Sequence, residues 1–262
     1  MEQKGSALWV SLNRADLHNA FNEHVIEEIT RTFRSVSAHD QTAHGDQYRC
    51  VILTGNGPSF SAGADLNWMR KMASYSEDGN RVDSLKLFDM FHAIRTAPVP
   101  VIARVNGAAL GGGSGLVAAC DFALAVDSAL FGFTEVKLGL VPAVISRFVM
   151  DKMGKGHCQR FFLTGERFSA ATAVRVGLVQ SVFPSLAELD QEISKLTTEL
   201  AANSPAGMSA CKQLIERVCV MSLDESKEHV ASVIAKVRVS PQGQEGISSF
   251  LNKKKPSWVR KW

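Results

Sequence analysis

The sequence has few cysteines and no long hydrophobic run. Its five cysteines are an odd number, widely scattered, and none forms a CxxC pair or a His/Cys spacing typical of metal ligands. This argues against a disulfide framework and a structural metal, and predicts reduced thiols buried as small apolar side chains. No apolar run approaches the roughly 20 residues that a membrane-spanning helix needs. We therefore expect a globular protein of the cytoplasm or the mitochondrial matrix, with no membrane association.

The sequence also has little net charge once its tail is set aside. The formal net charge is +3, and the tail supplies five cations with no acid, namely Lys253, Lys254, Lys255, Arg260 and Lys261. The rest of the chain is close to neutral, which argues against nucleic-acid binding as the main function. The basic tail still permits a local contact with phosphates, those of a nucleic acid included.

Nucleotide-binding motifs are absent from the most glycine-rich segment. Gly111, Gly112 and Gly113 follow an apolar run from Val99 to Val105, but no Lys-Ser or Lys-Thr comes after them and the GxGxxG spacing is missing. The pattern predicts a strand, a tight turn and a buried helix whose first N–H groups have no helical acceptor. Such donors suit a developing negative charge, so the segment resembles half of an oxyanion hole. A simple turn is the alternative.

A second cluster of small residues, Ser59 to Leu66, follows the strand predicted at Cys50–Leu53. An oxyanion hole usually requires two converging N–H groups. Two such turns, each after a strand, are therefore a stronger indication of a site than either alone.

Strand and helix patterns alternate through the first half of the chain. Strands are predicted at Ala7–Leu12, Cys50–Leu53, Val99–Val105 and Phe122–Val126, and helices at Phe21–Val36 and 82–95. This alternation favours parallel βαβ units. A short strand at 178–183 and helices at 169–176, 185–202, 205–220 and 223–239 follow, the last ending before Pro241. The polar segment 39–47 is expected to be a solvated loop.

A series of short motifs runs along the chain in order. They are Asn13-Arg14 with Asn19-Ala20, Phe60-Ser-Ala-Gly-Ala-Asp65, Pro100-Val-Ile-Ala-Arg-Val-Asn-Gly107, Ala109-Leu-Gly-Gly-Gly113, Ala119-Cys-Asp121, Leu163-Thr-Gly-Glu-Arg-Phe168 and Gly177-Leu-Val179. In this set and order the chain resembles the enoyl-CoA hydratase/isomerase (crotonase) superfamily over nearly its whole length. The resemblance implies an α/β fold, with a crotonase-like ββα spiral core over residues 1–200. It also implies a helical trimerisation region over residues 201–262, in a homotrimer or homohexamer.

The same resemblance implies an acyl-CoA substrate, and no separate cofactor because coenzyme A is part of that substrate. The thioester oxygen is expected to meet the backbone N–H groups of Ala64 and Gly112. Further residues implied to contact the substrate are Ala62, Leu66, Asn67 and Gly111, with Lys254 reaching the coenzyme A phosphates. Arg14 and His18 are additional candidates for the phosphates.

Hydratases of this superfamily usually carry two glutamates, and this chain matches one of them. Gly115 stands where the first would be, and Glu135 matches the second. Apolar neighbours such as Phe131 and Phe133 would raise the carboxyl pKa toward neutrality, which suits acid/base chemistry. The alternative is a solvent-facing strand residue. We expect an ordered water in the space left at Gly115.

The loop Pro142-Ala-Val-Ile-Ser146, together with Gly115, resembles a subgroup of methylglutaconyl-CoA and carboxygeranoyl-CoA hydratases of leucine and terpene breakdown. The first hypothesis is therefore hydration of a 2-enoyl thioester by Glu135 alone. A distal carboxylate on the substrate would need a cation, for which Arg147, Lys137 and Arg70 are candidates. The second hypothesis is Δ3,Δ2-enoyl-CoA isomerisation, which needs only one carboxylate. The third is a non-catalytic acyl-CoA-binding or RNA-binding module.

Overall fold

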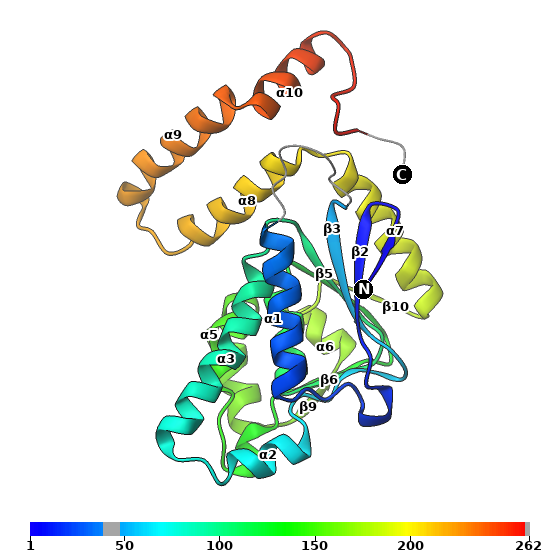
Figure 1. Ribbon diagram of the computed structural model, residues 1–262, viewed down its shortest axis with the longest axis vertical. Coiled ribbons are helices and arrows are strands. Elements are labelled where there is room, and N and C mark those ends of the chain that lie inside the picture. Colours follow the sequence, from blue (N-terminus) through cyan, green and yellow to red (C-terminus); the bar gives the residue numbers. More distant parts are fainter. Residues whose placement is uncertain (39–47, 260–262) are drawn as a thin grey trace.

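The computed structural model describes residues 1–38 and 48–259, so the segments 39–47 and 260–262 lie outside the described residues. Two sheets form the core (Figure 1). The first has the strand order β1-β2-β3-β5-β7-β10, with β1 at Glu2–Lys4, β2 at Ala7–Leu12, β3 at Cys50–Gly55, β5 at Val101–Val105, β7 at Phe122–Val126 and β10 at Ser181–Phe183. The second has the order β4-β6-β8-β9, with β4 at Ser59–Ser61, β6 at Ala108–Leu110, β8 at Leu130–Gly132 and β9 at Arg167–Ser169. Neighbouring strands are parallel except in the pairs β1–β2 and β8–β9.

Three successive turns of the chain each contribute one strand to each sheet and then helical structure. In the first turn β3 and β4 precede α2 (Leu66–Met72) and α3 (Glu77–Arg95), and in the second β5 and β6 precede α4 (Gly112–Ala119). In the third, β7 and β8 precede a 3-10 turn (Glu135–Leu138) and α5 (Ala143–Thr164). This confirms the expected ββα spiral. The prediction that one tight turn joins the strand at Val99–Val105 to the buried helix is corrected, because β6 lies between β5 and α4.

Both faces of the first sheet are buried, which explains the continuous apolar runs in its strands. Val51, Leu53 and Val101 belong to a core cluster that includes residues of α1 (Glu23–Ala38), α3 and α4. Ile52 and Ile102 alternate with them and pack on the opposite face in a cluster with residues of α7 (Leu186–Ala201). Complete burial of one such side chain contributes about 1.5–3 kcal/mol, so the two clusters hold the spiral rigid beneath its loops.

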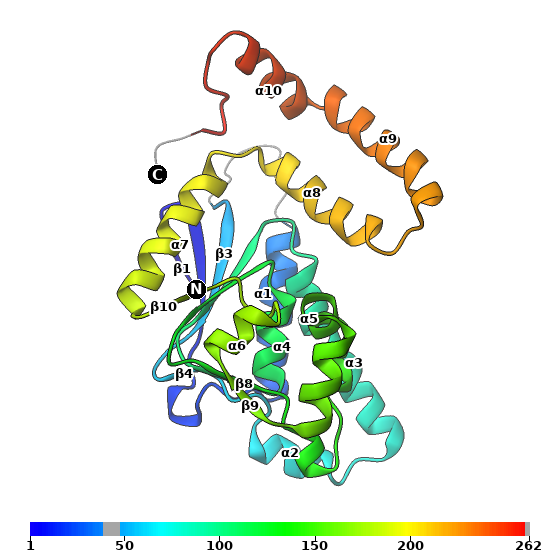
Figure 2. The same cartoon turned by 180° about the vertical axis from the view of Figure 1, so that it is seen from behind.

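The last three helices extend away from the sheets (Figures 1 and 2). After α6 (Ala170–Arg175) and α7, the chain forms α8 (Pro205–Val218), α9 (Leu223–Val239) and α10 (Pro241–Leu251). The bounds of α9 match the prediction, but α10 was not predicted. Pro241 begins this helix at its first turn, where the missing N–H costs nothing, and the Ser240 hydroxyl accepts from the Gly243 amide. The predicted division of the chain at residues 200 and 201 stays a prediction.

Across the described ranges 1–38 and 48–259, each helix is too short or too polar to traverse a lipid bilayer.

Candidate active site

Ala64, Gly112 and Glu135 each follow a strand of the second sheet. β4 ends at Ser61, β6 at Leu110 and β8 at Gly132. These three strands are parallel neighbours, so the loops that leave them meet at one edge of the sheet. The structure therefore brings the three residues together, although 71 sequence positions separate the first from the last.

The loops that carry Ala64 and Gly112 touch each other at Gly63. The φ angle of Gly63 is +86°, a conformation that favours glycine. A Cβ atom at Gly63 would lie 2.7 Å from the Leu110 carbonyl oxygen and 3.2 Å from the Gly112 amide nitrogen. Only the lack of a side chain allows this approach, which keeps the two loops in contact.

The backbone N–H groups of Ala64 and Gly112 are both available to a ligand. Ala64 forms an isolated parallel bridge with Phe21, in which the Phe21 amide donates to Gly63 O (2.8 Å) and the Asp65 amide donates to Phe21 O (3.0 Å). Because the bonds flank Ala64, its own N–H faces away from Phe21. Gly112 is the first residue of α4, where an N–H has no helical acceptor. Neither amide donates to another of the described residues.

Asp65 anchors the loop of Ala64 to α2 and to Arg14. One carboxylate oxygen accepts from the amides of Asn67 (2.7 Å) and Trp68 (3.4 Å), and the other accepts from the Arg14 guanidinium (2.9 Å). Burial alone would raise the pKa of Asp65, but the Asn67 amide, Arg14 and the Trp68 amide outweigh it and lower that pKa. Arg14, a candidate for the coenzyme A phosphates, holds this loop, and its contact with phosphates stays a prediction. His18 likewise lies 3.0 Å from the Ser59 hydroxyl through its Nδ1 atom.

Glu135 presents its carboxyl group to the start of α4. Its Oε1 atom lies 3.2 Å from the position that a Cβ atom at Gly111 would take. Its Oε2 atom is buried and has no hydrogen-bond partner among the described residues. Burial raises the pKa of this carboxyl group above its ordinary value of 4.5, and the hydrogen bond from its own backbone amide opposes the rise only in part. Phe131 and Phe133 are fully buried nearby in sequence.

The space beside Gly115 is filled by protein. Gly115 is buried in α4, and a Cβ atom there would lie 2.3 Å from Ile145 Cγ2 and 3.1 Å from Phe91 Cε1. The expectation of an ordered water at this place is therefore wrong. An apolar side chain of α5 occupies the space, and a water would lack the two to four polar partners that it needs.

The profile of the enoyl-CoA hydratase/isomerase family matches residues 2–261. The chain belongs to this family. An enoyl-CoA hydratase structure from Shewanella pealeana is 36% identical, with a TM-score of 0.91 over 98% of this chain and 94% of that one. The 2,3-dehydroadipyl-CoA hydratase of Escherichia coli is 30% identical over 96% of this chain and 94% of its own. A mitochondrial Delta(3,5)-Delta(2,4)-dienoyl-CoA isomerase of Dictyostelium discoideum is 30% identical, and the match covers 84% of this chain and 78% of that protein.

The family assignment makes the chain an enzyme of the hydratase type. Members of this family bind acyl-CoA substrates and commonly form oligomers. The three loops at the edge of the second sheet are thus the candidate active site, and two carry main-chain donors while the third carries a carboxyl group.

The other predicted contact residues divide into two groups. Ala62, Leu66 and Asn67 are exposed around the loop of Ala64, and Gly111 is half-buried between Gly112 and the Glu135 carboxyl group. Lys254 follows α10, whereas α2 marks the end of the molecule that carries the Ala64 loop. These two segments lie at opposite ends of the chain's longest axis (Figure 1). Within one chain, the structure does not bring Lys254 to the other candidates.

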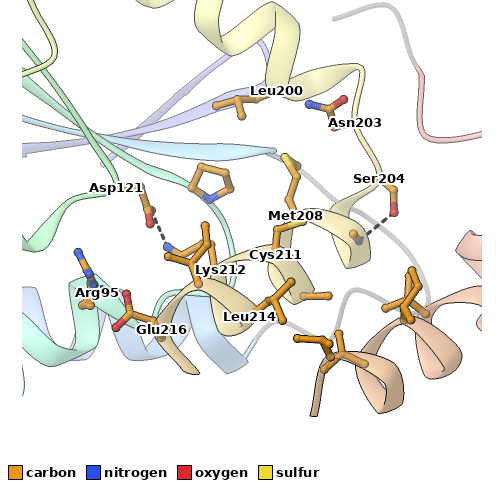
Figure 3. Close-up of a pocket in the computed structure, with 18 of the residues that line it drawn as sticks. Arg95, Asp121, Leu200, Asn203, Ser204, Met208, Cys211, Lys212, Leu214 and Glu216 are labelled. Atoms are coloured by element: carbon orange, nitrogen blue, oxygen red, sulfur yellow. Dashed lines mark hydrogen bonds and ion pairs between the residues drawn. The ribbon is translucent and has the colours of Figure 1, made fainter. Parts of the chain in front are cut away.

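A cavity of about 940 Å³ lies elsewhere, between α8, α9 and the core (Figure 3). Its apolar wall is interrupted by two ion pairs, one between Lys212 and Asp121 (2.5 Å) and one between Arg95 and Glu216 (2.6 Å). None of the three candidate residues is among the described residues that line it. The cavity is therefore separate from the candidate active site.

Two side chains beside the site were missed by sequence reasoning. Phe21 was taken as the first apolar residue of a helix, but α1 begins at Glu23 and Phe21 pairs with Ala64 instead. The helical spacing of Phe21 with the apolar residues that follow it, such as Val25 and Ile29, gave no indication of this pairing. Ile145 lies in the segment Pro142–Ser146, which was predicted as a loop but forms the N-cap and first turn of α5. The unusual sequence of this segment was the indication that could have identified it.

Proposed function

We propose that the protein hydrates a 2-enoyl-CoA thioester by means of a backbone oxyanion hole and a single carboxyl group. The observation that supports this is the meeting of the Ala64 and Gly112 amides with Glu135 on three adjacent loops. The two N–H groups donate to the thioester oxygen as enolate charge develops on it. Loss of one such donor typically costs about 2.7–4 kcal/mol of transition-state stabilisation.

In this reaction Glu135 moves both protons. Its carboxylate accepts a proton from water while the water oxygen forms a bond to C3, and the electrons of the C2–C3 double bond move toward the thioester oxygen. The protonated carboxyl group then returns a proton to C2, which regenerates the carboxylate. The unpartnered Oε2 atom and the raised pKa of Glu135 support this role.

For the substrate we propose a branched or dicarboxylic 2-enoyl-CoA of the 3-methylglutaconyl-CoA type. The support is the Pro142–Ser146 motif and the name of the Escherichia coli relative, a hydratase of another dicarboxylic acyl-CoA. Of the cations considered for the distal carboxylate, Arg147 lies 3.2 Å from Asp151 and Arg70 donates to the Asn67 side chain. Lys137 has no ion-pair partner within the described part of the chain, and it stays a candidate.

A panel of three thioesters tests the proposed reaction. We expect 3-methylglutaconyl-CoA to be hydrated with the highest kcat/KM and crotonyl-CoA with a lower one, while a 3-enoyl-CoA is not isomerised. Loss of absorbance of the conjugated thioester and mass spectrometry of the product measure both reactions. Turnover of the 3-enoyl substrate alone would contradict hydration.

The second candidate function is Δ3,Δ2-enoyl-CoA isomerisation. The observation that favours it is the packing of Ile145 and Phe91 around Gly115, which leaves Glu135 as the carboxylate of the site. Isomerisation moves one proton between C2 and C4 and needs no second acid. The isomerase among the relatives shows that the family includes this class of reaction.

The pH dependence provides a separate test of Glu135. The proposed step needs the ionised carboxylate, so kcat/KM should rise with pH through a pKa above 4.5. A raised folded pKa also means that the folded protein binds this proton more tightly than the unfolded chain. The free energy of unfolding should therefore fall as the pH rises from 4.5 through the folded pKa. A pH–rate profile and denaturant unfolding across this range measure both trends, and a rate inflection at or below 4.5 would contradict the assignment.

We further propose a homotrimer or a homohexamer. Four apolar side chains on or between α9 and α10 are more than two-thirds exposed, namely Leu223, Val239, Phe250 and Leu251. Apolar surface of this kind commonly marks an interface. Four further expectations stay predictions. They are the compartment, the lack of a separate cofactor, the contact of Lys254 with phosphates and any nucleic-acid contact of the basic tail.

A further inference from the structure

Phe21 contacts both loops that carry the main-chain donors. It is 1% exposed and lies just before α1, in a segment that neither loop includes. Its backbone is bonded to the loop of Ala64, and its ring packs against Gly112. Phe21 therefore contacts both segments that would form the oxyanion hole.

The backbone of Phe21 determines which way the Ala64 N–H points. The Phe21 amide donates to Gly63 O at 2.8 Å, and the Phe21 carbonyl accepts from the Asp65 amide at 3.0 Å. These bonds hold the peptide units on both sides of Ala64. The N–H of Ala64 is thereby directed away from Phe21.

The ring of Phe21 determines how closely α4 approaches. A Cβ atom at Gly112 would lie 2.4 Å from Phe21 Cζ and 3.3 Å from both Cε atoms, so the end of the ring rests on Gly112. The ring also packs near Trp68 of α2, with centroids 6.4 Å apart and planes tilted by 53°. Because protein interiors are close-packed, a smaller side chain at Phe21 would let Gly112 and the start of α4 shift.

We propose that Phe21 is a positioning residue that sets the separation and direction of the two oxyanion-hole donors. The inference rests on the proposed function, because it assigns Phe21 a role only through Ala64 and Gly112. Preorganised donors stabilise the transition state at no reorganisation cost, and a misplacement of about 1 Å can lower the rate about 100-fold. Phe21 therefore affects kcat much more than substrate binding.

The test compares Phe21→Leu and Phe21→Ala with the same two changes at Phe33. Phe33 is fully buried on α1, about three helical turns from Phe21, and serves as a matched core position. We expect kcat to fall about 10-fold in Phe21→Leu and about 100-fold in Phe21→Ala, with KM within about 3-fold of the parent. The Phe33 variants should lose stability while their kcat stays within about 3-fold. If Phe21→Ala does not fold, the test is the comparison of kcat between Phe21→Leu and Phe33→Leu.

A second readout does not depend on turnover. Donors that polarise the thioester carbonyl shift the ultraviolet absorption of a bound conjugated probe, cinnamoyl-CoA, to longer wavelength. We expect this shift in the parent and the Phe33 variants and a smaller one in the Phe21 variants. An active parent whose kcat and shift both survive Phe21→Leu and Phe21→Ala overturns the Phe21 inference alone. A parent that binds the probe without a shift overturns the oxyanion hole and the inference together. A parent with the shift but no turnover of any enoyl-CoA overturns only the hydration.

Discussion

Glu135→Gln should abolish most turnover while acyl-CoA binding persists. The amide keeps the shape of the carboxyl group but cannot accept a proton from water, and general acid–base catalysis typically contributes about 10²–10⁴-fold to the rate. We therefore expect kcat on the best 2-enoyl-CoA to fall by about 10³-fold, with the Kd of a saturated acyl-CoA within about 3-fold of the parent. Steady-state kinetics and isothermal titration calorimetry measure the two quantities.

The same variant should be at least as stable as the parent at neutral pH. Burial raises the pKa of Glu135, so its ionised form destabilises the folded state, and a neutral side chain removes that cost. Glu192→Gln is the matched control, because Glu192 lies on α7, away from the candidate site, and pairs among the described residues with Lys195 alone. A Glu135→Gln protein that keeps parental kcat contradicts the assigned role. A parent with no turnover but tight acyl-CoA binding would favour the binding module instead.

Gly115→Glu should destabilise the protein severely without creating a second catalytic acid. The first added atom already overlaps Ile145 Cγ2, and the carboxylate would be buried in an apolar setting. Overpacking alone costs about 1–3 kcal/mol and an unpaired buried charge adds to it, so we expect a loss of about 3 kcal/mol or more. Denaturant unfolding at neutral pH measures the loss, and the pH–rate profile should keep a single acidic inflection where protein folds.

The clash with Ile145 can be isolated by a double-mutant cycle. Ile145→Ala alone should cost about 2–5 kcal/mol by leaving a cavity. In the double variant the glutamate fills part of that cavity, so its loss should be smaller than the sum of the single losses by about 0.5–3 kcal/mol. Additive losses, or a Gly115→Glu protein as stable as the parent, would show that α5 does not exclude an acid from this position.

Elements with a clear apolar period were predictable from the sequence. The strands at Ala7–Leu12 and Phe122–Val126 and the helix at Leu223–Val239 match their predicted bounds. In the two strands, burial on one or both faces imposes a pattern that is local in sequence. The bounds of the helix come from local signals at its ends, the capping box of Ser222 and Glu225 and the proline at 241. By contrast β4, β6 and β8 have three residues each, too few for any period to appear. Their existence depends on pairing with one another.

The sequence by itself determined the family, the glycine-rich loop at Gly111–Gly113, the small-residue loop at Ser59–Leu66 and the glutamate at 135, because each requires particular residue types within a few positions. Only the tertiary structure decided that these loops share one sheet edge and that Ile145 fills the space beside Gly115. It also decided that Phe21 contacts both loops that carry the donors. Such contacts join residues far apart along the chain. They depend on how strands pair and side chains pack, and no local pattern records either.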